Sequence, residues 1–236
     1  MTVHILATGT SRGIGAAIVE AFAADDVRVF GHASRPDHDV IGADLNHPGT
    51  AGALWAEALD RLDGRIDVLV NNAGIFEAAP IDLPDAQWLA AWERTMRIDL
   101  TAAAELCRLA VLHWGATGAG GRIVNVASRA AHRGDSPAHW HYAAAKAGMV
   151  AMTKTIARGY AAQSIFAFAV CPGFTLTGMA DDYLASRGGD RILADIPLGR
   201  VAEPAEVAAA VRFLALDAPP SMTGAIIDIN GASYVR

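Results

Sequence analysis

The sequence contains little cysteine and no long run of one charge. Its two cysteines, Cys107 and Cys171, lie far apart in apolar surroundings and fit no CxxC or Cys/His ligand spacing. We interpret them as reduced core thiols of a cytoplasmic protein. The 19 basic and 25 acidic residues give a net charge of −6 without a basic stripe, which argues against nucleic acid as a partner.

Long apolar runs and flexible linkers are also missing. No stretch of about 18 uninterrupted apolar residues occurs, so we expect no membrane span. Residues 1–9 lack the basic start and the long apolar run of a secretory leader. No segment rich in Pro, Gly and Ser divides the chain, and 53% of its residues are hydrophobic. We therefore expect one domain over residues 1–236 with a large core.

Short apolar runs alternate with longer amphipathic segments along the chain. Strands are expected at residues 3–7, 27–31, 40–43, 67–70, 122–126, 165–170 and 225–229. Helices are expected at 14–24, 50–62, 85–114 (one long stretch, straight or bent), 139–160 and 204–216. The strands are almost continuously apolar, which is typical of strands buried on both faces. The pattern predicts a Rossmann-type α/β fold, a doubly wound parallel sheet of about seven strands with helices on both faces.

Only about ten residues, 32–41, separate the second and third expected strands, and they include Pro36. A parallel crossover usually takes a dozen or more residues, often as a helix. We expect an extended connection there with no helix, or at most one helical turn.

A glycine-rich turn connects the first expected strand to the first expected helix. Glycine allows a sharp turn and a close approach of the backbone to a pyrophosphate, and a helix N-terminus favours negative charge. The alternative is a tight loop without a ligand, but the place of this turn in an α/β chain favours a nucleotide. The expected phosphate-binding residues are Gly9, Ser11, Arg12, Gly13, Ile14 and Gly15.

The second strand ends without the carboxylate that usually holds the ribose 2′-hydroxyl of NAD(H). No acidic residue occurs between Asp26 and Asp37, whereas Ser34 and Arg35 follow that strand. Arg12 and Arg35 are suited to bind a 2′-phosphate, with a hydrogen bond from the Ser34 hydroxyl. We therefore favour NADP(H), with NAD(H) as the alternative; the alternative for the two arginines is that they are merely solvated.

Tyr142 and Lys146 are four residues apart, on one face of an expected helix. A nearby ammonium favours the phenolate and pulls the pKa of a tyrosine down toward the working pH. Ser128 follows the strand at 122–126, and the carboxyl ends of parallel strands line the ligand crevice. The three residues together indicate acid–base chemistry on a substrate oxygen, with Tyr142 as the proton donor.

In this combination the sequence resembles the short-chain dehydrogenase/reductase family over nearly its whole length. The motifs include the turn at 8–15, the run at 71–74, Ser128, the Tyr142/Lys146 pair, Pro172-Gly173 with Thr177, and the stretch from Pro197 to the last strand. The resemblance implies an NAD(P)(H)-dependent oxidoreductase that interconverts a carbonyl and a secondary alcohol. It also implies that Lys146 holds the nicotinamide ribose hydroxyls, that Ser128 orients the substrate oxygen, and that the chain forms a homotetramer or homodimer through its two long helices.

Further cofactor contacts are implied by the same resemblance. Those expected to line the cofactor cleft, in addition to the glycine turn and to Tyr142 and Lys146, are Asp44, Leu45, Asn71, Ala73 and Gly74. Those expected to cover the nicotinamide end are Pro172, Gly173, Phe174 and Thr177.

One catalytic position departs from the family pattern. Family members usually have an asparagine in the fourth helix, whose backbone holds a water of a proton relay to the lysine; the matching residue is Asp99. If the backbone carbonyl acts in the relay, the change is tolerable, whereas a functional side chain would place a carboxylate beside Lys146. We keep Asp99 among the expected catalytic residues.

The substrate side is less informative. His132, His139 and Trp140 lie between Ser128 and Tyr142 and are expected to line one wall of the substrate site, although a plain surface loop is about as probable. The spacing of His139 and His141 fits no common zinc pattern, so we expect no metal. A substrate loop is expected at about 175–200, with Gly188-Gly189 as a hinge.

The substrate itself stays open. A 3-oxoacyl thioester, a sugar or polyol, and a small cyclic ketone are all compatible with the sequence. Two other classes of protein compete with an enzyme: a nucleotide-binding regulator and a catalytically weak scaffold subunit. The intact Tyr142/Lys146 pair argues against both, and Asp99 is the only support for the scaffold.

Overall fold

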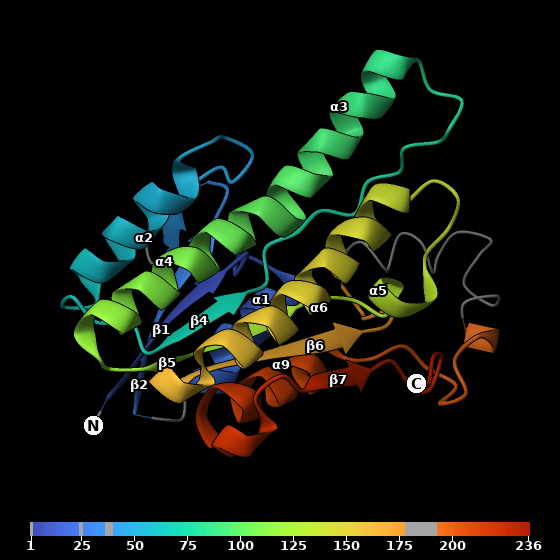
Figure 1. The fold of residues 1–236 in the computed structure, drawn as a ribbon. Helices are drawn as coiled ribbons and strands as arrows, with labels where there is room; N and C mark the ends of the chain where they lie inside the picture. The colour runs from blue at the N-terminus through green and yellow to red at the C-terminus, as the bar shows by residue number, and fades with distance from the viewer. Residues whose placement is uncertain (1, 24–25, 36–39, 178–192) are drawn as a thin grey trace.

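The computed structural model describes residues 2–23, 26–35, 40–177 and 193–236. Seven parallel strands form one sheet in the order β3-β2-β1-β4-β5-β6-β7 (Figure 1). The strands are β1 (Val3–Thr8), β2 (Val27–Ala33), β3 (Val40–Gly42), β4 (Val68–Asn71), β5 (Gly121–Val126), β6 (Ile165–Pro172) and β7 (Ile226–Ile229). The strand order reverses between β1 and β4, where doubly wound folds bind their ligands. The predicted fold class is confirmed.

Helices cover both faces of this sheet (Figure 1). The α-helices are α1 (Gly13–Phe22), α2 (Thr50–Arg61), α3 (Asp85–Met96), α4 (Ala102–Thr117), α5 (Ala130–Arg133), α6 (Trp140–Tyr160) and α9 (Pro204–Arg212). Two short 3₁₀ helices are η2 (Ala161–Gln163) and η5 (Pro220–Met222). Among the helices that the structure describes, none has the length and apolar character needed to span a membrane.

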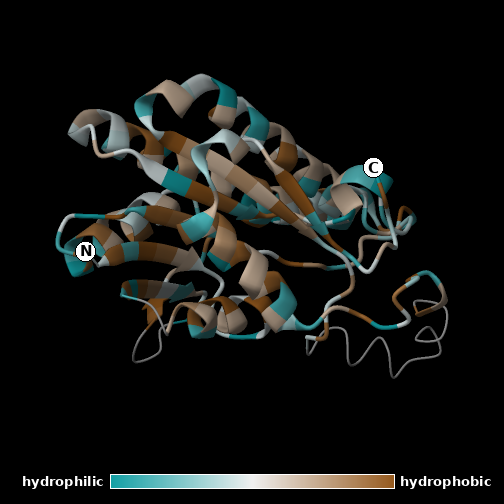
Figure 2. Cartoon of the chain, turned by 90° about the horizontal axis from the view of Figure 1, so that it is seen from below, coloured by the Kyte–Doolittle hydropathy of each residue, from teal (hydrophilic) through white to brown (hydrophobic). Residues whose placement is uncertain are grey.

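Neighbouring strand residues supply two separate hydrophobic cores because their side chains alternate between the faces. Leu6 and Leu69 pack with α2, α4 and α6, whereas Ile5 and Val70 pack with α1 and α9. Figure 2 shows the resulting hydropathy pattern, with hydrophobic strands between helices whose outer sides carry hydrophilic residues. With both faces covered, the ends of the strands are the part of the sheet left for ligands.

The long predicted helical stretch is interrupted at one point. A π-helical turn, η1 (Arg97–Thr101), joins α3 to α4 and carries Asp99, and the helical path continues to Thr117. A second π turn, η4 (Phe213–Asp217), ends the helix that was expected to be regular through residue 216. Such turns often occur at functional sites, and the periodicity of the sequence did not distinguish them from regular helix.

Other boundaries moved by a few residues, and α5 was not predicted. The helix expected from residue 14 begins at Gly13, and the strand expected to end at residue 170 continues to Pro172. The short connection between β2 and β3 was expected to be extended, but residues 36–39 of it lie outside the described residues.

Gly121 at the start of β5 is required by a buried aromatic ring. A Cβ atom there would lie 2.1 Å from the Trp114 indole, which is 1% exposed and donates a hydrogen bond to the Ile66 carbonyl. Gly121→Ala should lower the free energy of unfolding by about 1–3 kcal/mol because the core must shift. Gly52→Ala in α2, where the added Cβ meets nothing within 4 Å, should raise it by up to about 1 kcal/mol. Urea unfolding measures both, and equal stability of the two variants would contradict this packing.

Candidate active site

The turn between β1 and α1 has the conformation that glycine permits. Gly9 and Gly13 have φ values of +69° and +54°, a region that other residues rarely adopt. A Cβ at Gly15 would lie 1.9 Å from the Gly9 carbonyl oxygen. The helix N-cap, Arg12, makes no side-chain cap hydrogen bond, and the first turn of α1 holds no acidic residue. The free N–H groups and the narrow turn fit the pyrophosphate of a dinucleotide.

Asn72 fastens this turn to the end of β4. Its side-chain amide donates hydrogen bonds to the carbonyl oxygens of Thr8 (3.0 Å) and Gly9 (2.9 Å). The Thr8 hydroxyl in turn accepts hydrogen bonds from the backbone N–H groups of Asn72 and Ala73, both at 3.0 Å. Asn72 was not predicted to have this role, because only the strand order shows that β1 and β4 are neighbours.

Asn71 was expected to line the cofactor cleft, but its side chain points into the core. It is 2% exposed and donates a hydrogen bond to Asn125 Oδ1 at 2.9 Å. Asn125 continues the network to the Thr153 hydroxyl of α6 at 2.8 Å. Asn71 therefore links β4 to β5 and α6 rather than presenting its amide at the cleft.

The side chains expected at the adenosine end are available for a ligand. Arg12, Ser34 and Arg35 are exposed, and none of the three has a side-chain hydrogen bond or ion pair within the described part of the chain. Asp44 is also exposed and accepts a hydrogen bond from the Asn46 N–H, whereas Leu45 is 5% exposed and belongs to the core.

A buried histidine joins the glycine turn to the end of β3. His32 Nδ1 lies 3.3 Å from the Gly9 nitrogen, and its Nε2 lies 2.8 Å from the Ala43 carbonyl oxygen. Burial lowers the pKa of His32, so the neutral ring accepts a hydrogen bond from Gly9 and donates one to Ala43. His32 was not predicted to be a site residue, because its partners are distant in the sequence.

Ser128, Tyr142 and Lys146 come together where β5 ends. Tyr142 and Lys146 lie one turn apart in α6, with Lys146 Nζ 5.6 Å from the centroid of the phenol ring. The Ser128 side chain is hydrogen-bonded to Tyr142, and its Oγ accepts a hydrogen bond from the Ala130 N–H at 3.1 Å. The structure thus gathers the three residues that the sequence singled out for proton transfer.

The ammonium group of Lys146 is buried among polar partners. Its Nζ donates a hydrogen bond to the Val126 carbonyl oxygen (3.2 Å) and lies 3.6 Å from Asp99 Oδ2. Asp99 is 0% exposed, and its Oδ1 accepts a hydrogen bond from the Ile75 N–H at 2.8 Å. A Cβ at Gly74 would lie 3.1 Å from Asp99 and 3.2 Å from Lys146. Asp99, at the position where the family pattern has an asparagine, therefore directs its carboxylate toward Lys146.

The charges around Tyr142 act in opposite directions. Burial raises the pKa of Tyr142, and the Asp99 carboxylate adds to this rise. Lys146 and the hydrogen bond from Ser128 lower the pKa of the phenol, and the sequence predicted this effect of the lysine. The effect of burial on the pKa is larger, so the pKa of Tyr142 is raised. Burial likewise raises the pKa of Asp99, opposed by Lys146 and the Ile75 N–H.

The three expected substrate residues have different surroundings. His139 stacks on Phe76 with ring centroids 3.9 Å apart, and Phe76 meets the Tyr142 ring edge-on at 4.8 Å. Trp140 is 54% exposed and packs edge-on against Trp88 of α3. The His132 ring points toward β6, as described below. Of the three, only His139 is linked to Tyr142, through Phe76.

The nicotinamide end is described in part. Gly173 donates a backbone hydrogen bond to Ile229, and a Cβ there would lie 2.9 Å from Asn230. The Arg129 guanidinium lies 4.8 Å above the Phe174 ring, and the methyl group of Thr177 borders Gly13. Pro172 is buried at the end of β6. Residues 178–192 of the expected substrate loop, with the proposed hinge at Gly188-Gly189, lie outside the described residues.

Comparison with known proteins shows the class. The profile of a family described as Enoyl-(Acyl carrier protein) reductase, within the short-chain dehydrogenases, matches residues 9–232. A 3-oxoacyl-(acyl-carrier-protein) reductase of Synechocystis sp. is 36% identical over 96% of this chain and 94% of its own. The enzyme of that name from Escherichia coli is 34% identical, over 98% and 96%. Cis-4-hydroxycyclohexanecarboxylate dehydrogenase of Sinomonas cyclohexanicum is 38% identical, over 95% and 93%.

The chain belongs to the short-chain dehydrogenase/reductase family. It is an oxidoreductase that acts on the CH–OH group of its substrate with a nicotinamide cofactor. The family assignment agrees with the fold, with the glycine turn and with the Ser128, Tyr142 and Lys146 arrangement.

Asp99→Asn should shift the pH dependence of alcohol oxidation to lower pH. Removing the carboxylate removes one of the causes that raise the pKa of Tyr142, so the phenolate forms at lower pH. The acidic limb of the kcat/KM profile should move to lower pH. Asp60→Asn on the exposed side of α2 serves as the control and should leave the profile in place. An unchanged or upward-shifted limb in Asp99→Asn would show that the carboxylate does not act on Tyr142.

Proposed function

We propose that this enzyme is an NADP(H)-dependent reductase of 3-oxoacyl thioesters. The observation that carries the proposal is the convergence of Ser128, Tyr142 and Lys146 beside a turn suited to bind a pyrophosphate. The names of the relatives from Synechocystis sp. and Escherichia coli support the thioester as substrate. A ketone or polyol of another type is the alternative, and the Sinomonas relative supports a cyclic one.

The proposed reaction divides the chemistry between the cofactor and the chain. A nicotinamide cofactor, when bound, would supply the hydride that reduces the carbonyl carbon. Ser128 holds the carbonyl oxygen by a hydrogen bond, and Tyr142 transfers its hydroxyl proton to that oxygen, so that the product is a secondary alcohol. Lys146 stabilises the phenolate that remains, and the buried position of the pair keeps this charge interaction away from bulk water.

The aromatic residues next to Tyr142 fit this role. Phe76 and His139 form a stacked pair against the phenol ring, and the His139 Nδ1 is held 2.7 Å from the Ser136 hydroxyl. These contacts limit the rotamers of Tyr142 and exclude water from one side of its ring. The same wall is able to contact the acyl part of a substrate.

The preference for NADP(H) rests on two exposed cations, one at the N-terminus of α1 and one after β2. Arg12 and Arg35 carry positive charge without a carboxylate partner in the described residues, and a 2′-phosphate would provide that partner. Asp44, the nearest acidic residue after β3, is instead engaged in its own turn with Asn46 and lies 3.5 Å from His47.

Assembly into a homodimer or homotetramer remains part of the proposal. Exposed apolar side chains lie on the long helices that family members are expected to pair. They are Leu89 on α3, Leu112 on α4 and Trp140 on α6. Burying such side chains between subunits would remove apolar area from water.

Tyr142→Phe tests the catalytic assignment. Loss of the phenolic proton should lower kcat for a short 3-oxoacyl thioester by on the order of 10²- to 10⁴-fold, measured by NADPH oxidation. Dissociation constants for NADPH should stay within a few-fold of the wild type, which shows that the fold is intact. Undiminished turnover in Tyr142→Phe would favour a different proton donor, and a wild type that binds NADPH without turnover would favour the regulator.

The same assay separates the candidate substrates. The panel contains a 3-oxoacyl thioester, the corresponding 2-enoyl thioester and 4-oxocyclohexanecarboxylate. The proposal expects the highest kcat/KM for the 3-oxoacyl thioester. A higher value for the cyclic ketone would move the substrate toward that of the Sinomonas relative, and a higher value for the enoyl thioester would overturn carbonyl reduction.

Arg35→Ala and Arg12→Ala test the cofactor preference. Each should weaken NADPH binding by about tenfold through the loss of a charge-assisted contact, with little effect on NADH. Arg158→Ala, on the exposed C-terminal part of α6, should change neither dissociation constant. Fluorescence titration with both cofactors provides the measurement. Tighter binding of NADH than of NADPH by the wild type would contradict the assignment.

A further inference from the structure

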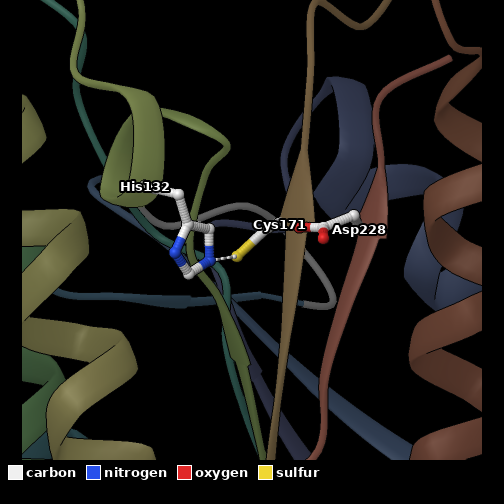
Figure 3. A group of neighbouring side chains, drawn as sticks. All are labelled: His132, Cys171 and Asp228. Atoms are coloured by element: carbon white, nitrogen blue, oxygen red, sulfur yellow. Dashed lines mark hydrogen bonds between the residues drawn. The ribbon is translucent and has the colours of Figure 1, made fainter. Parts of the chain in front are cut away.

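Three potential metal ligands meet near the catalytic residues. Ser128 precedes the short helix α5, and the three ligands gather near the C-terminal end of that helix. They are His132 at the end of α5, Cys171 on β6 and Asp228 on β7 (Figure 3). One ligand atom from each lies within 4.8 Å of the others. Cys171 and Asp228 are register partners on neighbouring strands, so their side chains emerge on the same face of the sheet. No other such cluster occurs among the described residues.

The distance between the nitrogen and sulfur atoms matches a metal site. His132 Nε2 lies 3.5 Å from Cys171 Sγ. In a tetrahedral zinc site, with the sulfur about 2.3 Å and the nitrogen about 2.0 Å from the metal, these two atoms are about 3.5 Å apart. The thiol and the imidazole therefore already form one edge of a zinc tetrahedron.

The carboxylate of Asp228 supplies a free ligand atom. Its Oδ2 accepts a hydrogen bond from Arg236 Nε at 2.9 Å, whereas its Oδ1 is buried without a hydrogen-bond partner in the described structure. A buried acceptor that lacks a partner costs free energy. A cation between Oδ1 and the other two ligands would remove this cost.

The protonation states permit binding of a cation at the expense of one proton. Burial lowers the pKa of His132, so the ring is neutral, and its Nε2 faces the Cys171 thiol at hydrogen-bond distance. Loss of the thiol proton frees the Nε2 lone pair for a metal ion. Burial raises the pKa of the Cys171 thiol to about 11. A metal ion must therefore displace the thiol proton, which leaves for solvent, and binding should become tighter as the pH rises.

We propose that His132, Cys171 and Asp228 form a zinc site with a water molecule as the fourth ligand. Imidazole, thiolate and carboxylate are the three ligand types that proteins use for Zn²⁺. The ion would tie α5 to β6 and β7. Because α5 begins two residues after Ser128, the site would also fix the backbone next to that serine. The proposed contribution of the metal to hydride transfer is this positioning.

The sequence predicted no metal because it indicated only histidines that are close together along the chain. His132, Cys171 and Asp228 are dozens of residues apart. The pairing of β6 with β7 brings Cys171 beside Asp228, and α5 places His132 against Cys171. His139 and His141, whose spacing first raised the question, instead contact Phe76 and Trp92 of α3.

Cobalt(II) is a suitable probe, because coordination by a thiolate gives a sulfur-to-cobalt charge-transfer band in the near-ultraviolet. The full-length protein, stripped with a chelator, should bind one equivalent with this band, and Zn²⁺ should abolish it by competition. Cys171→Ser should lose the band. His132→Gln and Asp228→Asn should each weaken binding at least tenfold. His47→Gln is the matched control, since His47 is exposed near β3, at the opposite edge of the sheet.

Arg236 provides a variant whose expected effect is a gain. Its guanidinium competes with the metal for the Asp228 carboxylate, so Arg236→Gln should bind Zn²⁺ several-fold more tightly. Zn²⁺ should also raise the melting temperature of the wild type but not of Cys171→Ser. Three results would overturn the proposal: no charge-transfer band in the wild type, an identical band in Cys171→Ser, or unchanged or weaker binding in Arg236→Gln.

Discussion

A buried ammonium group organises the active site. Lys146 is 3% exposed, and a charge that is removed from water must be satisfied by polar partners. These partners are the carbonyl oxygen of Val126 at the end of β5 and the carboxylate of Asp99 in η1. Gly74 leaves the space in which the two charges approach each other. One cation thus fixes the relative positions of α6, β5, the π turn and the segment after β4.

The same cation links structure to chemistry. Lys146 lowers the pKa of Tyr142, but Asp99 opposes it, and burial of the phenol outweighs the lysine. An uncharged side chain at position 99 would leave the effect of the lysine on the phenol undiminished. Asp99 therefore reduces the influence of Lys146 while it also satisfies the buried charge. The departure from the family pattern adjusts the proton donor rather than removing it.

What the sequence predicted, and what it missed, follows from the range of the contacts. The turn from Gly9 to Gly15 and the Tyr142/Lys146 pair are local patterns, in which spacing alone determines which atoms meet. The hydrogen bonds of Asn72 with Gly9 join residues 63 positions apart and depend on the pairing of β1 with β4. The π turn that carries Asp99 interrupts a periodicity that looked regular in the sequence.

The order of the strands explains why so many functional residues follow strand ends. The parallel strands β1, β4, β5 and β6 have their carboxyl ends on the same side of the sheet. These ends are followed by Gly9, Asn72, Ser128 and Gly173. Three of these residues are held by a neighbouring strand end: Gly9 and Asn72 by each other, and Gly173 by Ile229 of β7. The segments that follow the carboxyl ends of the strands are therefore connected to one another between β1 and β7. A metal ion between α5, β6 and β7 would connect these segments to α5. Among the described hydrogen bonds, the Ser128 Oγ contacts the backbone only at Ala130, the first residue of this helix.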